Sequence, residues 1–149
     1  MEKKLIWLDL EMTGLDPNAE RIIEIYTCIT NEDLTEIIEG PGMVISQSKE
    51  LIDGMDEWNQ EHHSASGLID EVLASKISEQ EAEQRTLEFI KQHVGKNESP
   101  LCGNTVWHDR KFLSLYMPEL EDYFHYRCID VSSVKELTSI PVSYTHLTL

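Results

Sequence analysis

The segment Leu5–Glu11 constrains the fold more than any other part of this sequence. In an extended strand its odd-numbered residues face one side and its even-numbered residues the other, so Asp9 and Glu11 share a largely apolar face. Carboxylates about 7 Å apart at such a face repel each other and lose hydration. A divalent cation is the simplest group that relieves them. The alternative is a strand that ends before Asp9, with both acids as solvated turn residues.

A third acid, Asp109, strengthens the prediction of a cation site. The spacing of apolar residues predicts a helix over 105–117, and Asp109 falls within its apolar stripe, in a slot that would face the sheet. Asn104 is placed to cap this helix, so Asp109 is not needed as a cap. Two segments then present inward carboxylates, as a Mg²⁺ or Mn²⁺ site with oxygen ligands requires.

The order of the predicted elements indicates the fold class. Strands come first and then alternate with helices, which is typical of an α/β domain with a mixed β-sheet flanked by helices. The predicted strands cover 5–10, 21–30, a bent third segment over 34–38 and 43–45, then 101–103 and 126–130. Three helices are predicted. The first starts at a capping box over 78–81 and ends at Gly95, the second covers 105–117, and the third begins at Val131.

Charge and composition restrict the class of partner. The chain has 28 acids and 12 bases, a net charge of −16, which disfavours binding of long nucleic acid through its phosphates. A small pocket that holds one or two phosphates through metal ions needs no basic surface. No apolar stretch approaches the ~20 residues that span a bilayer. The three scattered cysteines are expected to be reduced core residues of a cytoplasmic protein with no membrane contact.

Longer stretches around these acids resemble a known family. Asp9–Pro17 followed by Arg21–Ile25 resembles the first motif of the oligoribonucleases, which belong to the DEDD 3′-to-5′ exonucleases and have a ribonuclease H-like fold. The resemblance continues in family order to Leu137, through segments at 58–59, 63–68, 102–104, 109–113, 116–120, 124–127, 129–132 and 135–137.

The resemblance implies two-metal hydrolysis of phosphodiester bonds, with release of nucleoside 5′-monophosphates from the 3′ ends of RNAs as short as dinucleotides. Asp9 and Glu11 would be metal ligands, with Asp9 bridging both ions, and Asp109 would hold the other ion directly or through water. It also implies a homodimer, in which one subunit contributes to its partner's site. The implied substrate-binding residues are Leu15, Trp58, His63, Asn104 and, reaching into the partner's site, Tyr126 and Arg127.

Four of the implied substrate contacts also have a purely structural interpretation. Leu15 would be turn packing, Trp58 and Tyr126 would be core aromatics, and His63 would be a surface cap. Base stacking on rings tolerates any sequence, so aromatic residues in these positions suit an enzyme without sequence preference.

The C-terminal part departs from the family. The final family motif, a His followed five residues later by an Asp, supplies the general base and a fourth acid; no acid follows Glu136, and His146 lacks the acid after it. We expect an exonuclease domain at 1–138, incomplete at its C-terminus, and a non-native tail at 139–149. The chain itself should then be nearly inactive.

Four alternatives stay open at this point. The first is that the tail is a genuine C-terminal strand. The second is that the chain is a non-catalytic module that binds dinucleotides or dimerises. The third is a superfamily relative that trims longer DNA or RNA, and the fourth is an acidic α/β domain without a site.

Overall fold

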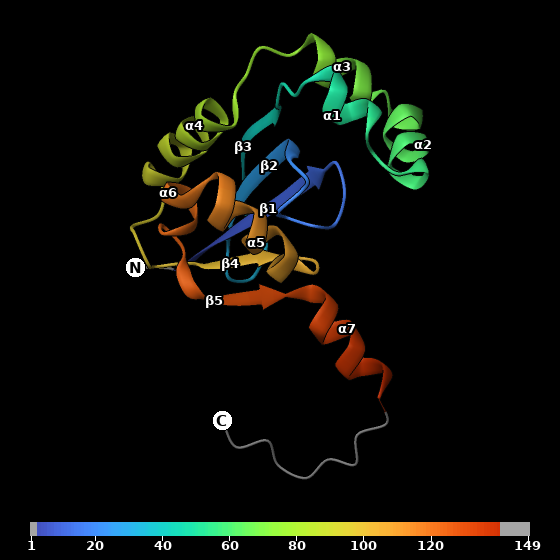
Figure 1. The fold of residues 1–149 in the computed structure, drawn as a ribbon. Coiled ribbons are helices and arrows are strands. Elements are labelled where there is room, and N and C mark those ends of the chain that lie inside the picture. The colour runs from blue at the N-terminus through green and yellow to red at the C-terminus, as the bar shows by residue number, and fades with distance from the viewer. Residues whose placement is uncertain (1–2, 141–149) are drawn as a thin grey trace.

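A computed structural model of the chain describes residues 3–140 (Figure 1). It contains one mixed five-stranded sheet with the strand order β3-β2-β1-β4-β5. The first three strands pair in antiparallel fashion, whereas β1, β4 and β5 run parallel. The strands are β1 Lys4–Met12, β2 Ile22–Asn31, β3 Ile37–Val44, β4 Pro100–Gly103 and β5 His125–Asp130. The helices are α1 Lys49–Asp53, α2 Glu57–Ser66, α3 Leu68–Ala74, α4 Glu79–Lys91, α5 Val106–Tyr116, α6 Pro118–Glu121 and α7 Val131–Ser139.

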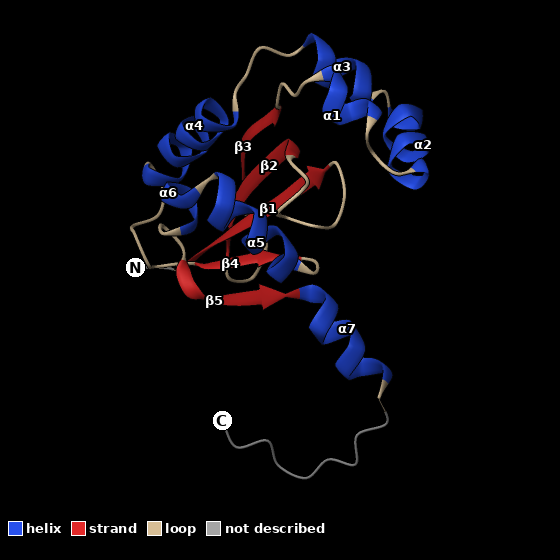
Figure 2. Cartoon of the chain, in the orientation of Figure 1, coloured by secondary structure: helices blue, strands red, loops and turns tan. Residues whose placement is uncertain are grey.

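One face of the sheet carries the main core. The even-numbered residues Ile6, Leu8 and Leu10 of β1 are buried there with apolar residues of α4, α5 and α6, and these helices lie along the sheet in Figure 2. The opposite face is less covered, as the half-buried Cys28 and the exposed Tyr26 of β2 show.

The expectation of three core cysteines is wrong. Cys102 is buried, but Cys28 is only half-buried and Cys128 is exposed on the edge strand.

Strand β1 continues past both of its acids. Asp9 lies opposite Tyr26 and Glu11 opposite Glu24 in the antiparallel register with β2, and the register shifts only between Glu11 and Met12. The alternative of a strand that ends before Asp9 is therefore wrong. An irregularity at this point increases local twist and is common beside functional sites.

Three short helices between β3 and α4 were not anticipated. Helices α1, α2 and α3 form a group beyond the carboxyl end of β1 and the amino end of the antiparallel β2 (Figure 1). They have a small core of their own, in which Ile52, Leu68 and Val72 pack against Ile23 of β2. Helix α2 lacked an apolar pattern because its buried residues, Asn59 and His63, are both polar.

Several helix and strand ends differ from the predicted ones. The third strand starts at Ile37 instead of residue 34, because Leu34 has a positive φ of 61° in the preceding turn. Helix α4 begins as predicted, with the Ser78 hydroxyl accepting from the Glu81 N–H at 3.1 Å, but it ends at Lys91 instead of Gly95. The predicted mixed α/β fold with flanking helices is otherwise confirmed.

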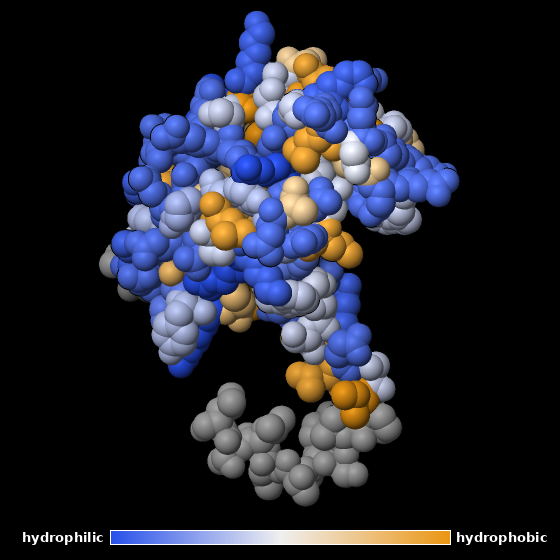
Figure 3. All heavy atoms as spheres, viewed as in Figure 1, coloured by the Kyte–Doolittle hydropathy of each residue, from blue (hydrophilic) through white to orange (hydrophobic). Residues whose placement is uncertain are grey.

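The last described elements bury little. Strand β5 has no fully buried residue, and α7 has none either. Figure 1 shows α7 projecting away from the sheet, and Figure 3 shows hydrophobic atoms exposed near its end. Leu137 of α7 and Ile140, which follows the helix, are both exposed. The predicted boundary at 138 falls in the last turn of this helix, and most of the predicted tail lies outside the described residues. Within residues 3–140, every helix is too short or too polar to cross a membrane.

A buried acid of α4 fixes the start of α6. The Glu83 carboxylate accepts hydrogen bonds from the backbone N–H groups of Glu119, at 2.7 Å, and Leu120, at 3.0 Å. We expect Glu83→Ala to lower the free energy of unfolding by about 3 kcal/mol, because two backbone N–H groups, one of them buried, lose their carboxylate acceptor. Glu83→Gln keeps an acceptor oxygen and should cost about 1 kcal/mol.

Urea unfolding monitored by circular dichroism measures both changes. Glu88→Ala, at an exposed position of the same helix, is the control and should change the stability by less than about 0.5 kcal/mol. Equal effects of Glu83→Ala and Glu88→Ala would contradict this role for Glu83.

Candidate active site

Two acids of β1 lie together on the less covered face of the sheet. Asp9 is exposed and Glu11 is half-buried, two residues farther along the same strand. Burial still removes part of the hydration of Asp9 and raises its pKa. Beside them, burial raises the pKa of Glu24 first, and the charges of Glu11, Glu71 and Asp9 raise it further. Burial, and for Glu24 the neighbouring acids as well, thus disfavours the charged forms of these carboxylates.

Helix α5 brings Asp109 to the same place. Strand β4 ends at Gly103, so the Leu10 N–H of β1 donates to the Asp109 carboxylate at 3.0 Å. Asp109 is 6% exposed and lies within the stripe predicted to face the sheet, with Val106, Phe112 and Leu113. Burial raises its pKa to about 7, and the charges of Asp9 and Glu11 add to the rise while the bond from Leu10 opposes it. Three acids from two elements therefore interact at the end of β1.

The loop after β1 holds Leu15 out in solvent. Its ends are tied by a bond from the Thr13 N–H to the Arg21 carbonyl at 2.9 Å and by a hydrogen bond between the Thr13 hydroxyl and Glu20. Tyr116 of α5 donates to the Pro17 carbonyl at 2.7 Å. The Leu15 side chain is 77% exposed, so the interpretation as turn packing is wrong.

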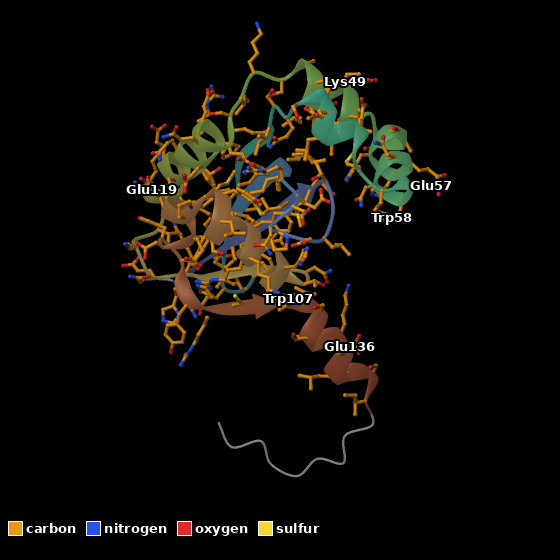
Figure 4. The ribbon with its side chains drawn as sticks, viewed as in Figure 1. Lys49, Glu57, Trp58, Trp107, Glu119 and Glu136 are labelled. Atoms are coloured by element: carbon orange, nitrogen blue, oxygen red, sulfur yellow. The ribbon has the colours of Figure 1, made fainter. Side chains whose placement is uncertain are left out.

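Helix α2 places two of the predicted residues near the same end of β1. His63 is buried, and its Nε2 lies 3.0 Å from the Met12 carbonyl, so it is not a surface cap. Trp58 is 66% exposed and is not a core aromatic; Figure 4 shows it on α2, the helix beyond the arrowhead of β1. A cavity of ≈ 240 Å³ lies between these elements, lined by Glu11, Glu24, His62, His63, Ser66, Leu68 and Glu71.

The turn before α5 differs from the prediction. The N-cap is Thr105, with φ 57° and no side-chain cap bond, instead of Asn104. This left-handed conformation is uncommon for a β-branched residue, and the Thr105 N–H donates to Asp130 at 2.8 Å. In the parallel register Cys102 lies opposite Trp7, so Asn104 lies about level with Asp9 on the neighbouring segment. Asn104 is exposed and is not engaged as the cap.

Tyr126 and Arg127 are not brought to the acids of their own chain. Tyr126 is 73% exposed on β5, so the interpretation as a core aromatic is wrong. Strand β5 lies two strands from β1, and Tyr126 lies several residues before the level of Asp9. The separation is roughly 15 Å from strand geometry. Within one chain, these two residues therefore lie apart from Asp9, Glu11 and Asp109.

The donor set fits a divalent cation by its chemistry. Carboxylate oxygens are the ligands that Mg²⁺ and Mn²⁺ prefer. Burial raises the pKa values of Asp9 and Asp109, so a bound cation would stabilise their charged forms. Within residues 3–140, no three His, Cys, Asp or Glu side chains are arranged to hold one ion. The acids are thus grouped without forming a complete coordination shell.

Two residues of this region escaped sequence reasoning. Glu24 faces Glu11 across the β1–β2 pair and lines the cavity. His62 lies four residues after Trp58, and the two rings stack with centroids 4.8 Å apart. The four-residue spacing was visible, but it carries meaning only once 57–66 is known to be helical.

Comparisons with known proteins agree with this arrangement. The sequence model of the exonuclease family RNase_T matches residues 6–148. An oligoribonuclease of Shewanella loihica is 57% identical over 136 residues, which are 91% of this chain and 75% of that protein. The chain belongs to the oligoribonuclease family. An oligoribonuclease of Legionella pneumophila is 56% identical over 135 residues, or 91% of this chain and 72% of the relative.

Solved structures support the exonuclease fold of this oligoribonuclease-family chain. A product-bound exonuclease I has a TM-score of 0.69 and 13% sequence identity, and the likeness covers 93% of this chain and 32% of that protein. A second exonuclease I structure without ligand gives a TM-score of 0.68 over 99% of this chain and 34% of that protein. The chain thus spans about one third of exonuclease I, and the likeness concerns the fold alone.

Proposed function

We propose that this chain is a metal-dependent 3′-to-5′ exoribonuclease acting on very short oligoribonucleotides, down to dinucleotides, and releasing nucleoside 5′-monophosphates. The observation that carries the proposal is the meeting of Asp9, Glu11 and Asp109 at the end of β1, in a chain of the oligoribonuclease family. Metal dependence follows from this acid set, because the acids repel one another and offer oxygen ligands only.

In this mechanism the chain's residues hold the metal and the substrate. Asp9, Glu11 and Asp109 would bind two Mg²⁺ or Mn²⁺ ions, with the Leu10 N–H keeping the Asp109 carboxylate oriented. When bound, such ions activate the attacking water and stabilise the leaving 3′ oxygen. Leu15 would contact the bases, Trp58 would stack on one of them, and His63 and Asn104 would line the site.

The shape and charge of the chain favour short substrates. With a net charge of −16, the surface repels a long phosphate backbone, whereas a dinucleotide presents few phosphates beyond those that the ions hold. The cavity beside Glu11 has a volume of ≈ 240 Å³, which limits how much of the 3′ end of an RNA it can hold. All three cysteines are free, which agrees with a proposed cytoplasmic location, where thiols stay reduced.

Asp9→Asn tests the proposal. With 5′-phosphorylated diadenylate (pApA) and Mn²⁺, prolonged incubation of the unaltered chain should release AMP, and Asp9→Asn should lower that release by at least about 10²-fold. Mn²⁺ should also raise the melting temperature of the unaltered chain but not of Asp9→Asn, because bound metal stabilises the folded state.

Asp122→Asn is the matched control, since Asp122 is exposed at the opposite end of the sheet and pairs with Lys96. It should respond to Mn²⁺ and release AMP like the unaltered chain. If pApA binds without any AMP release from the unaltered chain, and restoring the family's final motif at the C-terminus brings no release either, the non-catalytic module becomes the better description. Equal cleavage of pApA and of a long single strand would overturn the proposed substrate size.

We also propose a homodimer formed through the β5 edge. Tyr126 and Ile129 are exposed on β5, an edge strand of the sheet, so apolar side chains lie beside Arg127 where a second chain could pack. We expect Ile129→Lys to shift a dimer to monomers, with a dissociation constant raised about 100-fold or more, because a buried lysine would be unpaired.

Sedimentation velocity over a concentration series measures this change. Ile37→Lys is the control, since Ile37 is an exposed isoleucine on the edge strand at the opposite side of the sheet; it should leave the dimer intact. A dimer that survives Ile129→Lys but not Ile37→Lys would place the interface on β3.

A further inference from the structure

His62 connects the active-site strand to the exposed tryptophan of α2. Its imidazole stacks on the Trp58 indole with centroids 4.8 Å apart and planes 10° from parallel. The His63 ring meets His62 edge to face at 5.5 Å, and His63 is itself held at the Met12 carbonyl, 3.0 Å away. A continuous set of contacts therefore runs from the end of β1 to the Trp58 ring.

The stack leaves one indole face free. Trp58 lies in the first turn of α2 and is 66% exposed, and within residues 3–140 its one stacking partner is His62. An exposed aromatic side chain without a fixed partner samples several rotamers and must lose that freedom when a ligand binds. Because His62 already covers one face, a nucleobase can stack only on the other.

His62 also lines the cavity beside the acids. The same ≈ 240 Å³ cavity is bounded by Glu11 of β1 and by His62 and His63 of α2. The imidazole therefore has two neighbours of different kinds, the indole on one side and the space next to a proposed metal ligand on the other. This position links the orientation of a base on Trp58 to the place where the scissile phosphate would lie.

We propose that His62 is a positioning residue for the substrate, whose ring fixes Trp58 so that the free indole face receives a base of the short RNA. The inference rests on the proposed function, since it needs Trp58 to stack on a base. Its effect is pre-organisation: the Trp58 ring is ordered before binding, so less freedom is lost when the base stacks.

Binding of pApA in the presence of Ca²⁺, measured by isothermal titration calorimetry, tests the proposal independently of turnover. We expect His62→Ala to weaken binding about 3- to 10-fold, the range for losing one pre-ordered side chain. His62→Phe keeps a ring that can stack and should bind within roughly 2-fold of the unaltered chain. Trp58→Ala should weaken binding by about 10-fold or more, and adding His62→Ala to it should have no further effect.

A second measurement follows the ring itself. The order parameter of the Trp58 indole N–H, from ¹⁵N relaxation of the free protein, should fall in His62→Ala and recover in His62→Phe. His93→Ala is the matched control: His93 meets the Phe89 ring edge to face, away from the cavity, and its loss should change neither binding nor the Trp58 signal.

The outcomes separate the two proposals. If His62→Ala binds like the unaltered chain while Trp58→Ala is weak, the role of His62 is overturned and base stacking stands. If His62→Phe is as weak as His62→Ala, the ring nitrogens matter and positioning by stacking is overturned. If Trp58→Ala binds normally, or if the unaltered chain does not bind pApA, the proposed substrate contact fails and the role of His62 fails with it.

Discussion

A chimaera in which residues 139–149 are replaced by the part of the Shewanella loihica oligoribonuclease that follows its aligned region is expected to release AMP from pApA about 10²–10⁴ times faster than the present chain. This is the usual contribution of a general base. The family resemblance places a base and a further metal-binding acid after Leu137, whereas the sequence holds no acid after Glu136. The gain should appear in the rate at saturating substrate, because Trp58 and Leu15 are already present.

Three histidines, His62, His63 and His108, lie on the helices that carry the site, α2 and α5. His63 Nε2 is engaged with the Met12 carbonyl, and the His62 ring is stacked on Trp58. The Nε2 of His108 is buried without a hydrogen-bond partner among the described residues. Burial also lowers the pKa of His108, with a further contribution from Lys111. Of these three rings, His63 has its Nε2 at a backbone carbonyl, and burial of His108 disfavours its protonated form.

Two controls isolate the cause of the gain. The same graft on Asp9→Asn should stay slow, because the added base has no metal-held water to act on. A chain ending at residue 138 should be as slow as the 149-residue chain, because removing the predicted tail adds no base. Measured rates for the present chain that equal those of the chimaera would show that a base is already in place.

Local periodicity was sufficient to find the acids. The two-residue period of a strand put Asp9 and Glu11 on one face, and the helical period of 106–116 put Asp109 in the buried stripe; both are confirmed by the observed elements and burial. The sequence alone predicts these positions because each periodicity involves residues of a single strand or helix. What the patterns could not supply is the bond between Asp109 and the Leu10 N–H, which exists because β4 ends at Gly103.

The rest of the site depends on features without a local signal. Helix α2 buries Asn59 and His63 instead of apolar residues, so its helical pattern was hidden and the stack of His62 on Trp58 was missed. The left-handed Thr105 at the start of α5 contradicts the expectation of an Asn104 cap, because its N–H is held by Asp130, 25 residues away. Such contacts are set by the tertiary structure, which a single sequence does not reveal.

Asp109→Asn is expected to make the metal-free protein more stable while removing its response to metal. The side chain is almost fully buried, and burial raises its pKa to about 7, with Asp9 and Glu11 contributing further. At pH 8 the folded chain must therefore keep a desolvated carboxylate close to two others. Asparagine is neutral and still offers an oxygen to the Leu10 N–H, so in EDTA the variant should gain about 2–4 kcal/mol in the free energy of unfolding.

The raised pKa of Asp109 sets the direction in which the stability difference between the two proteins changes with pH. A carboxyl group whose pKa is higher in the folded state than in the unfolded state favours folding while it is protonated. That stabilisation is complete below the ordinary aspartate pKa near 4 and is lost as the pH rises to about 7. The advantage of Asp109→Asn should therefore be full at pH 8 and should shrink toward zero at about pH 4.

Metal should reverse the order of the two proteins. Mn²⁺ stabilises a folded chain that binds it, and Asp109 is one of the three acids proposed to hold it, so the unaltered chain should gain in melting temperature at pH 8 while Asp109→Asn gains little. Thermal unfolding in EDTA and in Mn²⁺, at several pH values, measures all these differences; Asp122→Asn removes an exposed acid and should follow the unaltered chain throughout. An Asp109→Asn variant that is less stable in EDTA at pH 8 would show that the carboxylate is satisfied by the protein alone, and the reason for placing a cation here would be lost.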